Sequence, residues 1–357
     1  MKSQFFNTTR KKMENMRDKW KGFVLQLLCI TLLMTSVPAV IFAEDNNTTG
    51  KQDISWGIKY IGADLTMDKY SGNHIRVAVF DTGVSPHDDL KIAGGVSFVD
   101  YTTSYADDNG HGTIVAGSIA ARNNNIGIVG VAPEVDLYAV KVLDAFGHGN
   151  YKNLIEGIDW AINNKIQVIN ISFGDKKNDA HLEQAIRKGI NAGITFVVSS
   201  GNNGHNGSDT ITYPAKYPEV ISVGAVDNTL HVANFSSHGN RIDVVAPGAD
   251  IMSTTNDGGY EIEYGTSIAA AYVTGEVAVI LSYQPKIKPA DIKDIILKTT
   301  TKLGPKDSYG NGIVNVARAV NIVEGPIENT AYAHLKISQS ECANKSVNLK
   351  SRCRVFE

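Results

Sequence analysis

Cysteine is scarce in this sequence, with 3 cysteines among 357 residues. Cys29 lies inside an N-terminal apolar run, and Cys342 and Cys353 lie close together in the last segment. The latter two could pair in an oxidising compartment. The long region between Cys29 and Cys342 contains no cysteine at all. Disulfide bonds therefore cannot stabilise the central part of the chain, and an exported fold would need another source of stability.

An excess of positive charge is also missing. The formal net charge is -3 and 20% of the residues are charged, without the basic stripe that a nucleic-acid partner requires. No G-x-G-x-x-G pattern follows the first apolar run of the central region, residues 75–80, which argues against dinucleotide binding. Residues 52–323 contain no internal repeat and no low-complexity linker. We therefore expect one large domain with a substantial core.

The N-terminal segment differs in composition from the rest. A lysine- and arginine-rich lead precedes an apolar run over residues 23–43, and the polar residues 44–51 follow it. This pattern predicts a signal peptide over 1–43, cleaved after Ala43, and then a short spacer over 44–51. A retained membrane anchor is the alternative, because the run is about long enough to span a bilayer. We expect a secreted or cell-surface monomer that contacts a membrane only if this segment is retained.

From residue 75 onward, short β-branched runs alternate with longer amphipathic segments. Continuous apolar runs indicate strands covered on both faces, and their alternation with helices predicts an α/β fold with a parallel sheet. Ligands bind such sheets at the carboxyl ends of the strands. The expected strands are 75–80, 136–142, 167–171, 195–199 and 220–226, and the expected helices are 111–121, 151–163 and 180–192.

Polar residues occur where these elements end or begin. Asp81 follows the first strand, His111 begins the first long helix, and Asn202 follows the strand over 195–199. Each has a simpler explanation, because Asp81 could close a turn, His111 could pack at a helix start and Asn202 could occupy a left-handed turn. Their joint occurrence favours a functional site.

A fourth signal lies at Gly265-Thr266-Ser267, which leads into a run of small apolar residues. We expect Thr266 or Ser267 to cap a buried helix here, with Ser267 exposed near the helix N-terminus. The partial positive charge of that terminus favours a developing oxyanion. A capped buried helix without function is the simpler alternative.

The four residues suit acyl transfer. A serine hydroxyl needs a base to become nucleophilic, and His111 could serve Ser267 in this role. Asp81 could hold the imidazole in the correct tautomer. Asn202 and the Ser267 backbone N–H could donate hydrogen bonds to the oxyanion of a tetrahedral intermediate.

Three short motifs strengthen this hypothesis. Asp-Thr-Gly at Asp81, His-Gly-Thr at His111 and Gly-Thr-Ser at Ser267 resemble the catalytic signatures of the subtilisin family of serine proteases. The resemblance covers residues 52–323 and leaves 324–357 as a C-terminal extension. It implies a three-layer α/β fold with a mostly parallel sheet, and a serine endopeptidase that forms an acyl-enzyme on peptide or protein substrates.

The resemblance also implies a calcium site, which would replace disulfides as a stabiliser. Calcium takes several oxygen ligands, neutral carbonyls included, and binding to the native state alone stabilises it. The side chains would come from Gln52, Asp89 and Asn124, and the carbonyls from Arg122, Ile126 and Ile128. A weaker monovalent-ion site would use the carbonyls of Ala215, Tyr217 and Val220.

Substrate contacts follow from the same resemblance. The main specificity pocket would be lined by Ser172, Phe173, Gly174 and Gly201, with Thr212 near its floor. Tyr151 would form the wall of a more distant subsite. The substrate backbone would pair with extended segments at 146–149, which include Gly147, and at 172–174.

The sequence departs from the family pattern at several positions. Ile114 and the run 268–272 replace common residues at packing positions, and Glu263 and Tyr264 add a charge and a ring before Gly265. Residues 44–51 leave no room for the propeptide that the resemblance implies. A dedicated leader peptidase of the lantibiotic type is therefore one alternative. A catalytically weak relative that binds extended peptides is another, which the filled catalytic positions disfavour.

Overall fold

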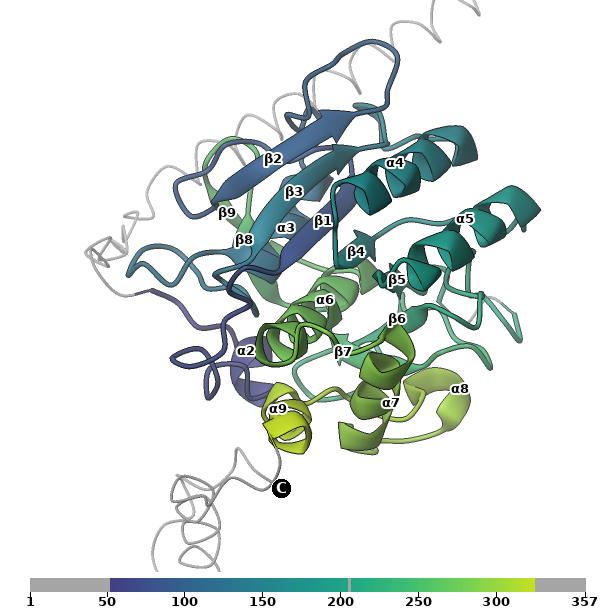
Figure 1. Ribbon diagram of the computed structural model, residues 1–357. Helices are drawn as coiled ribbons and strands as arrows, with labels where there is room; N and C mark the ends of the chain where they lie inside the picture. The colour runs from purple at the N-terminus through teal and green to yellow at the C-terminus, as the bar shows by residue number, and fades with distance from the viewer. Residues whose placement is uncertain (1–51, 205–206, 325–357) are drawn as a thin grey trace, which may run out of the picture. The chain divides into compact units, whose positions relative to one another are not determined.

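The computed structural model describes residues 52–204 and 207–324 (Figure 1). The expected signal peptide or anchor over 1–43, the spacer over 44–51 and the extension from residue 325 lie outside the described residues. So do Cys342 and Cys353, whose pairing stays a prediction.

A parallel sheet organises the described part of the chain. Seven strands are hydrogen-bonded in the order β2-β3-β1-β4-β5-β6-β7, and every neighbouring pair is parallel. A separate antiparallel hairpin consists of β8 and β9. The strands are β1 (Arg76–Asp81), β2 (Ile92–Ser97), β3 (Asp136–Lys141), β4 (Val168–Ile171), β5 (Thr195–Ser199), β6 (Ile221–Val226), β7 (Val244–Pro247), β8 (Ile251–Thr254) and β9 (Tyr260–Glu263).

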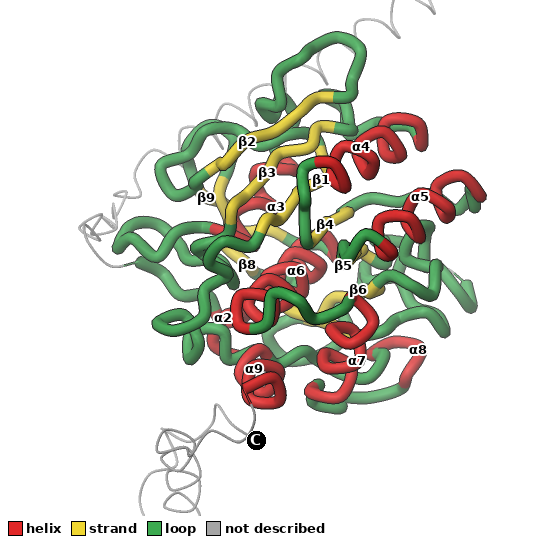
Figure 2. Tube along the Cα trace, in the orientation of Figure 1, coloured by secondary structure: helices red, strands yellow, loops and turns green. Residues whose placement is uncertain are grey.

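Helices cover both faces of the sheet, which gives three layers (Figure 1). One face carries α4 and α5, and the other carries α3 and α6 with the C-terminal helices beside them. Loops join these elements, among them the long segment over 98–110 between β2 and α3 (Figure 2). The helices are α2 (Trp56–Tyr60), α3 (His111–Ala120), α4 (Tyr151–Asn163), α5 (Ala180–Asn191), α6 (Thr266–Tyr283), α7 (Pro289–Thr299), α8 (Lys306–Tyr309) and α9 (Val316–Glu324).

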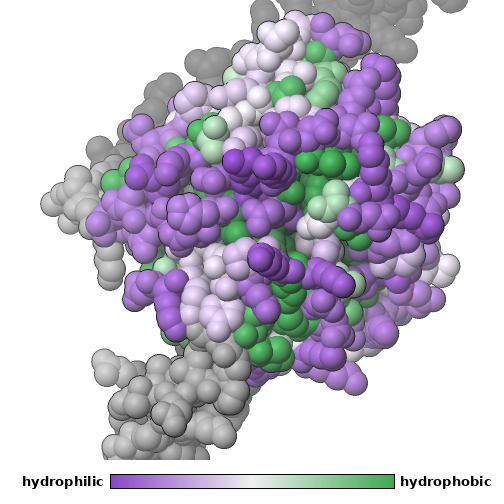
Figure 3. Space-filling model, viewed as in Figure 1, coloured by the Kyte–Doolittle hydropathy of each residue, from purple (hydrophilic) through white to green (hydrophobic). Residues whose placement is uncertain are grey.

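The alternation of side chains along β1 divides the core in two. Val77 and Val79 pack in the cluster with α3 and α6, whereas Ala78 and Phe80 pack in the cluster with α4 and α5. Gly157 lets α4 approach closely, since a Cβ there would lie 2.7 Å from the Phe80 ring. Burial of a ring such as Phe80 contributes roughly 1.5–3 kcal/mol. Polar side chains cover most of the surface seen in Figure 3.

Helix α6 runs through the core. Its residues from Thr266 to Leu281 are all buried, which explains why its sequence shows no polar face. Among the described residues it is the one helix long and apolar enough to cross a membrane, but 89% of that apolar window is buried inside the protein. Its length and composition are those of a core helix.

The sequence predicted five of these strands and three of these helices to within one or two residues. It missed β2, whose Ile92-Ala93-Gly94-Gly95 sequence has weak strand propensity, the edge strand β7 and the hairpin of β8 and β9. The carboxyl ends of β1, β4 and β5 lie at one edge of the sheet because these strands are parallel neighbours. The residues that follow them meet there.

Candidate active site

Asp81 is the last residue of β1 and is fully buried. One of its carboxylate oxygens, Oδ1, accepts a hydrogen bond of 2.8 Å from the backbone N–H of Thr82. The same oxygen lies 2.8 Å from Nδ1 of His111. The strand end therefore aims this carboxylate at the imidazole.

His111 is the first residue of α3, and its side chain is 36% exposed. The helix begins tightly against the end of β1, because a Cβ at Gly112 would lie 2.0 Å from the carbonyl oxygen of Gly83. Gly110, at the N-cap, has φ 116, a conformation that favours glycine. Gly110 and Gly112 therefore let the backbone turn and approach β1 closely enough to place His111 beside Asp81.

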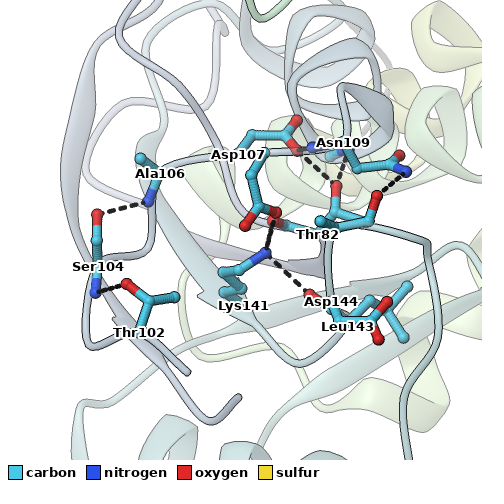
Figure 4. Close-up of polar contacts among 12 residues, drawn as sticks. Thr82, Thr102, Ser104, Ala106, Asp107, Asn109, Lys141, Leu143 and Asp144 are labelled. Atoms are coloured by element: carbon cyan, nitrogen blue, oxygen red, sulfur yellow. Dashed lines mark hydrogen bonds and ion pairs between the residues drawn. The ribbon is translucent and has the colours of Figure 1, made fainter. Parts of the chain in front are cut away.

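Asp107 holds the segment before this helix in place (Figure 4). Its buried carboxylate accepts hydrogen bonds from the Thr82 hydroxyl at 2.8 Å, the Asn109 N–H at 3.0 Å and the Gly110 N–H at 2.8 Å. The other oxygen accepts from the Thr113 N–H at 2.9 Å and from its hydroxyl at 2.7 Å. One carboxylate thereby ties the end of β1 to the start of α3.

Lys141 supports the same loop from β3 and was not singled out from the sequence (Figure 4). Its side chain is fully buried, and its ammonium donates to the Thr82 carbonyl at 2.6 Å, to Asp108 Oδ1 at 2.6 Å and to the Leu143 carbonyl at 3.0 Å. A lysine inside the apolar run of a core strand was the available signal, because a buried charge needs partners.

Ser267 is the second residue of α6, and the structure corrects two expectations about it. Gly265 is the N-cap and has no side chain that could cap the helix, so neither Thr266 nor Ser267 is the capping residue. Ser267 is also buried, with 7% of its surface exposed. The packing of α6 into the core carries its first turn below the surface, where Ser267 borders a cavity.

The Ser267 hydroxyl lies 3.1 Å from Nε2 of His111. It also lies 3.0 Å from the carbonyl oxygen of Ser172, which it can donate to instead. Asp81, His111 and Ser267 therefore form one hydrogen-bonded chain, although they come from β1, α3 and α6.

The imidazole of His111 lies in a negative environment. Its burial disfavours the imidazolium, but the nearby carboxylates of Asp81, Asp107 and Glu263 outweigh this effect and raise the pKa of His111 above its ordinary value. The site thus favours a protonated ring once a proton has been accepted.

Asn202 lies in the loop after β5. Its side-chain oxygen accepts hydrogen bonds from the Thr266 N–H at 3.0 Å and the Thr266 hydroxyl at 2.8 Å. These bonds fix the orientation of the amide and leave its nitrogen near Gly265, where a Cβ would lie 3.5 Å from it. The amide N–H groups therefore lie beside the start of α6.

A cavity of about 510 Å³ opens next to Ser267. Gly174 and Thr212 pack directly against each other in its lining, since a Cβ at Gly174 would lie 2.5 Å from the Thr212 hydroxyl. A second cavity of about 370 Å³ adjoins Phe173 and Gly174 and is lined by Gly147 and Tyr151. The first cavity gathers the expected pocket residues Ser172, Phe173, Gly174, Gly201 and Thr212 with Asn202 and Ser267.

Comparison with models of protein families matches residues 72–312 to the subtilase family. The chain belongs to this family. It is 44% identical over 284 residues to a thermostable alkaline protease of Halalkalibacterium halodurans, covering 79% of this chain and 78% of the relative. It is 44% identical over 288 residues to subtilisin E of Bacillus subtilis, covering 79% and 76%. It is 46% identical over 272 residues to a subtilisin of Bacillus pumilus, covering 75% and 99%. The protein is thus a subtilisin-like serine endopeptidase with the expected three-layer α/β fold.

The prediction that residues 146–149 form an extended segment of this subtilase is wrong. Residues 145–147 form a turn and a bend rather than an extended strand, and the only strand-like contact of the segment joins Leu143 to Gly149. The Asp144 carboxylate builds the turn by accepting from the N–H groups of Phe146 and His148, both at 2.9 Å. The side chain of Phe146 is left 81% exposed.

The residues of the expected calcium site lie together. Asp89 is fully buried, and its Oδ2 accepts from the Ile128 N–H at 3.0 Å, whereas its Oδ1 has no partner among the described residues. The Gln52 side-chain nitrogen, Nε2, donates to the carbonyls of Ile128, at 2.5 Å, and of Arg122. Burial raises the pKa of Asp89 above its ordinary range. A buried carboxylate oxygen without a partner suits a hard cation, whereas the carbonyls of Arg122 and Ile128 accept from the Gln52 amide here.

The expected monovalent-ion site is not supported by the subtilase structure. The carbonyl of Val220 accepts a hydrogen bond of 2.6 Å from the ammonium of Lys293, which also pairs with Asp243 Oδ2 at 2.8 Å. The Tyr217 carbonyl accepts from the Arg241 guanidinium at 3.2 Å. Side-chain cations therefore already satisfy two of the three carbonyls.

Proposed function

We propose that this subtilase is a secreted endopeptidase in which Ser267 attacks the peptide carbonyl, His111 acts as general base and then acid, and Asp81 orients the imidazole. The observation that carries the proposal is the hydrogen-bonded chain of Asp81, His111 and Ser267, with distances of 2.8 and 3.1 Å, beside a cavity of about 510 Å³. The arrangement meets the geometric requirement for an activated serine.

The first step requires the Ser267 proton to move to Nε2 of His111. The hydroxyl has one proton and two acceptors within reach, the Ser172 carbonyl at 3.0 Å and His111 Nε2 at 3.1 Å. Rotation toward His111 makes Oγ nucleophilic as the bond to the substrate carbonyl forms. Asp81 then stabilises the imidazolium, whose pKa the surrounding carboxylates already raise.

The tetrahedral intermediate carries a negative charge on the former carbonyl oxygen. Asn202 would donate to it through its amide nitrogen, because its oxygen is engaged by Thr266. The Ser267 N–H, at the start of α6, would be the second donor. His111 then protonates the leaving nitrogen, and water hydrolyses the acyl-enzyme by the same steps in reverse.

The pocket beside Ser267 would bind the side chain on the acyl side of the cleaved bond. Ser172, Phe173, Gly174, Gly201 and Thr212 line it. The second cavity, lined by Gly147 and Tyr151, would bind a residue farther upstream. Both are consistent with an extended peptide substrate.

Calcium is the proposed stabilising ion. Gln52, Asp89 and Asn124 would supply side-chain oxygens, and Arg122, Ile126 and Ile128 would supply carbonyls. For Gln52 this requires its amide to turn, because its nitrogen faces the carbonyls of Arg122 and Ile128. The unpartnered Asp89 Oδ1 supports the fit, since an adjacent cation removes the cost of burying that charge. The ion would hold the loop over 122–128 to the rest of the domain, and it takes no part in the chemistry at Ser267.

Secretion is proposed from the basic lead and apolar run of residues 1–43, together with the similarity to subtilisins. Protein recovered from the culture medium should begin at Glu44 when its N-terminus is sequenced. Full-length protein found only in the membrane fraction would instead support the anchor.

A general endopeptidase is favoured over a dedicated leader peptidase, because the relatives reported above are named as an alkaline protease and as subtilisins. The test of the catalytic proposal is labelling with a fluorophosphonate, which reacts with an activated serine. Wild type should be labelled and lose peptidase activity, and S267A should show neither labelling nor activity. A folded wild type that resists labelling would refute the proposal and favour a peptide-binding relative.

A further inference from the structure

The two sides of Ser267 differ in charge and in shape. On one side lies the cavity built by residues after β4 and β5, to which no residue of β9 contributes. On the other side lies His111, whose Nε2 is 3.1 Å from the Ser267 hydroxyl. Because His111 must protonate the leaving nitrogen, the residue after the cleaved bond has to lie on the His111 side.

Glu263 belongs to that side. It ends β9, four positions before Ser267, and pairs with Ile251 of β8, the strand whose Ser253 hydroxyl donates to the Ile114 carbonyl of α3 at 2.6 Å. Its carboxylate is one of the charges that raise the pKa of His111, the first residue of α3. In a strand, residues two apart share a face, so Glu261 and Glu263 lie on the same face. Glu261 is exposed and Glu263 is half-buried, so a bound peptide can reach both.

Among the described residues, neither the Glu261 nor the Glu263 carboxylate pairs with a lysine or an arginine. Burial, followed by the hydrogen bond to Glu261 and its charge, raises the pKa of Glu263 above its ordinary value. Two like charges held together next to the reacting atoms are unfavourable until a cation reaches them.

We infer that Glu263, supported by Glu261, selects substrates with lysine or arginine immediately after the cleaved bond. The inference rests on the proposed function and adds a specificity to it. A basic side chain would pair with the carboxylates as the leaving group departs, and an acidic one would be repelled. Glu263 thereby acts on substrate choice through charge, separately from the cavity on the acyl side.

An acyl-transfer assay measures specificity on the leaving-group side of Ser267 separately from specificity on the acyl side. The enzyme is acylated by one blocked tetrapeptide ester, and the dipeptide amides Lys-Ala-NH2, Ala-Ala-NH2 and Glu-Ala-NH2 compete with water for the acyl-enzyme. By microscopic reversibility, the amine enters where the leaving group departs. Product ratios then compare the three amines on one acyl group, so differences in acylation rate cancel.

Wild type should prefer Lys-Ala-NH2 over Ala-Ala-NH2 by about fivefold, the upper range for a partly exposed ion pair. E263Q should abolish the preference, E261Q should reduce it, and E263K should reverse it toward Glu-Ala-NH2. D294N removes an exposed carboxylate on α7 and serves as the charge control, which should behave as wild type. Added salt should weaken the preference in wild type.

The outcomes separate this inference from the proposed function. If no acyl-enzyme forms, the catalytic proposal itself fails. If it forms and partitions equally among the three amines, or if E263Q and E263K keep the wild-type preference, the role of Glu263 is refuted.

Discussion

Asp81 and His111 are 30 positions apart in sequence, yet their Oδ1 and Nδ1 atoms lie 2.8 Å from each other. The contact depends on how α3 begins against the end of β1. Gly112 lies so close to Gly83 that any Cβ would collide with its carbonyl, at 2.0 Å. Asp107 fixes the connecting loop with five accepted hydrogen bonds. The orientation of the imidazole is therefore a property of this junction.

Replacing Asp107 by asparagine should shift the pH dependence of kcat/KM. The Asp107 carboxylate is one of the charges that raise the pKa of His111, so its loss lowers that pKa. Activity needs neutral His111 as base, and the acidic limb of the profile should therefore move to lower pH. Stability should also fall by about 1–3 kcal/mol, because asparagine leaves buried donors without an acceptor.

The pH profile distinguishes this role from a merely structural one. D159N removes an exposed carboxylate on α4 and should leave the acidic limb in place. An unmoved limb in a folded and active D107N would show that Asp107 does not act on His111 through its charge.

Glu276 should make stability depend on pH. It is fully buried in α6, neither of its carboxylate oxygens pairs with a described side chain, and burial raises its pKa to about 8. The unfolded chain releases this proton near the ordinary value of 4.5, before the folded protein does. Stability from this group is therefore complete below that value and falls by about 1.4 kcal/mol per pH unit until the folded pKa is reached.

Denaturant unfolding of wild type, E276Q and E134Q between pH 5 and 9 measures this effect. E276Q cannot ionise and should flatten the decline relative to wild type. Glu134 is exposed, so E134Q controls for the lost charge and should retain the decline. Parallel curves for wild type and E276Q would contradict the prediction.

Removal of calcium should lower the melting temperature of the mature protein by several degrees, because a ligand of the native state alone stabilises it by RT ln(1 + [L]/Kd). D89N removes the unpartnered carboxylate oxygen and should make melting insensitive to calcium. D294N should respond as wild type does. Calorimetric scans in chelator and in added calcium measure the shift, and an identical Tm in both media for wild type would refute the assigned site.

The Lys293 ammonium should stabilise the fold at the position where the sequence predicted a monovalent ion. This ammonium pairs with Asp243 Oδ2 at 2.8 Å and with the Val220 carbonyl at 2.6 Å, and the side chain is 17% exposed. K293M should cost about 1–3 kcal/mol, since it leaves a mostly buried carboxylate without its partner and solvent screens only part of the effect.

Wild-type stability should not change when potassium replaces sodium at constant ionic strength. Guanidinium is itself a salt, so urea unfolding in each salt is the suitable measurement. A clear dependence on the identity of the monovalent ion in wild type, absent from K293M, would show that an ion binds there after all.

Local sequence determined much of the framework. Continuous apolar runs such as Val77–Phe80 are strongly predictive of buried parallel strands, and the rule that ligands bind at strand ends directed attention to Asp81 and Asn202. The motifs around His111 and Ser267 identified the other two candidate catalytic residues. Each of these signals is local, because it depends on propensity, periodicity or a short spacing.

Tertiary structure decided what depends on contacts between distant segments. The burial of Ser267 follows from the position of α6 in the core, and the distant Asn202 accepts from the first N–H of that helix. The turn at 145–147 follows from the Asp144 carboxylate. Lys293 reaches Val220 from 73 positions away, and no local pattern announces that an ammonium occupies a carbonyl cluster. The sequence thus determined which chemical groups are present and the strands that carry them. Only the packing of helices on the sheet decided their distances, burial and charge environment, since those are sums over residues far apart in the chain.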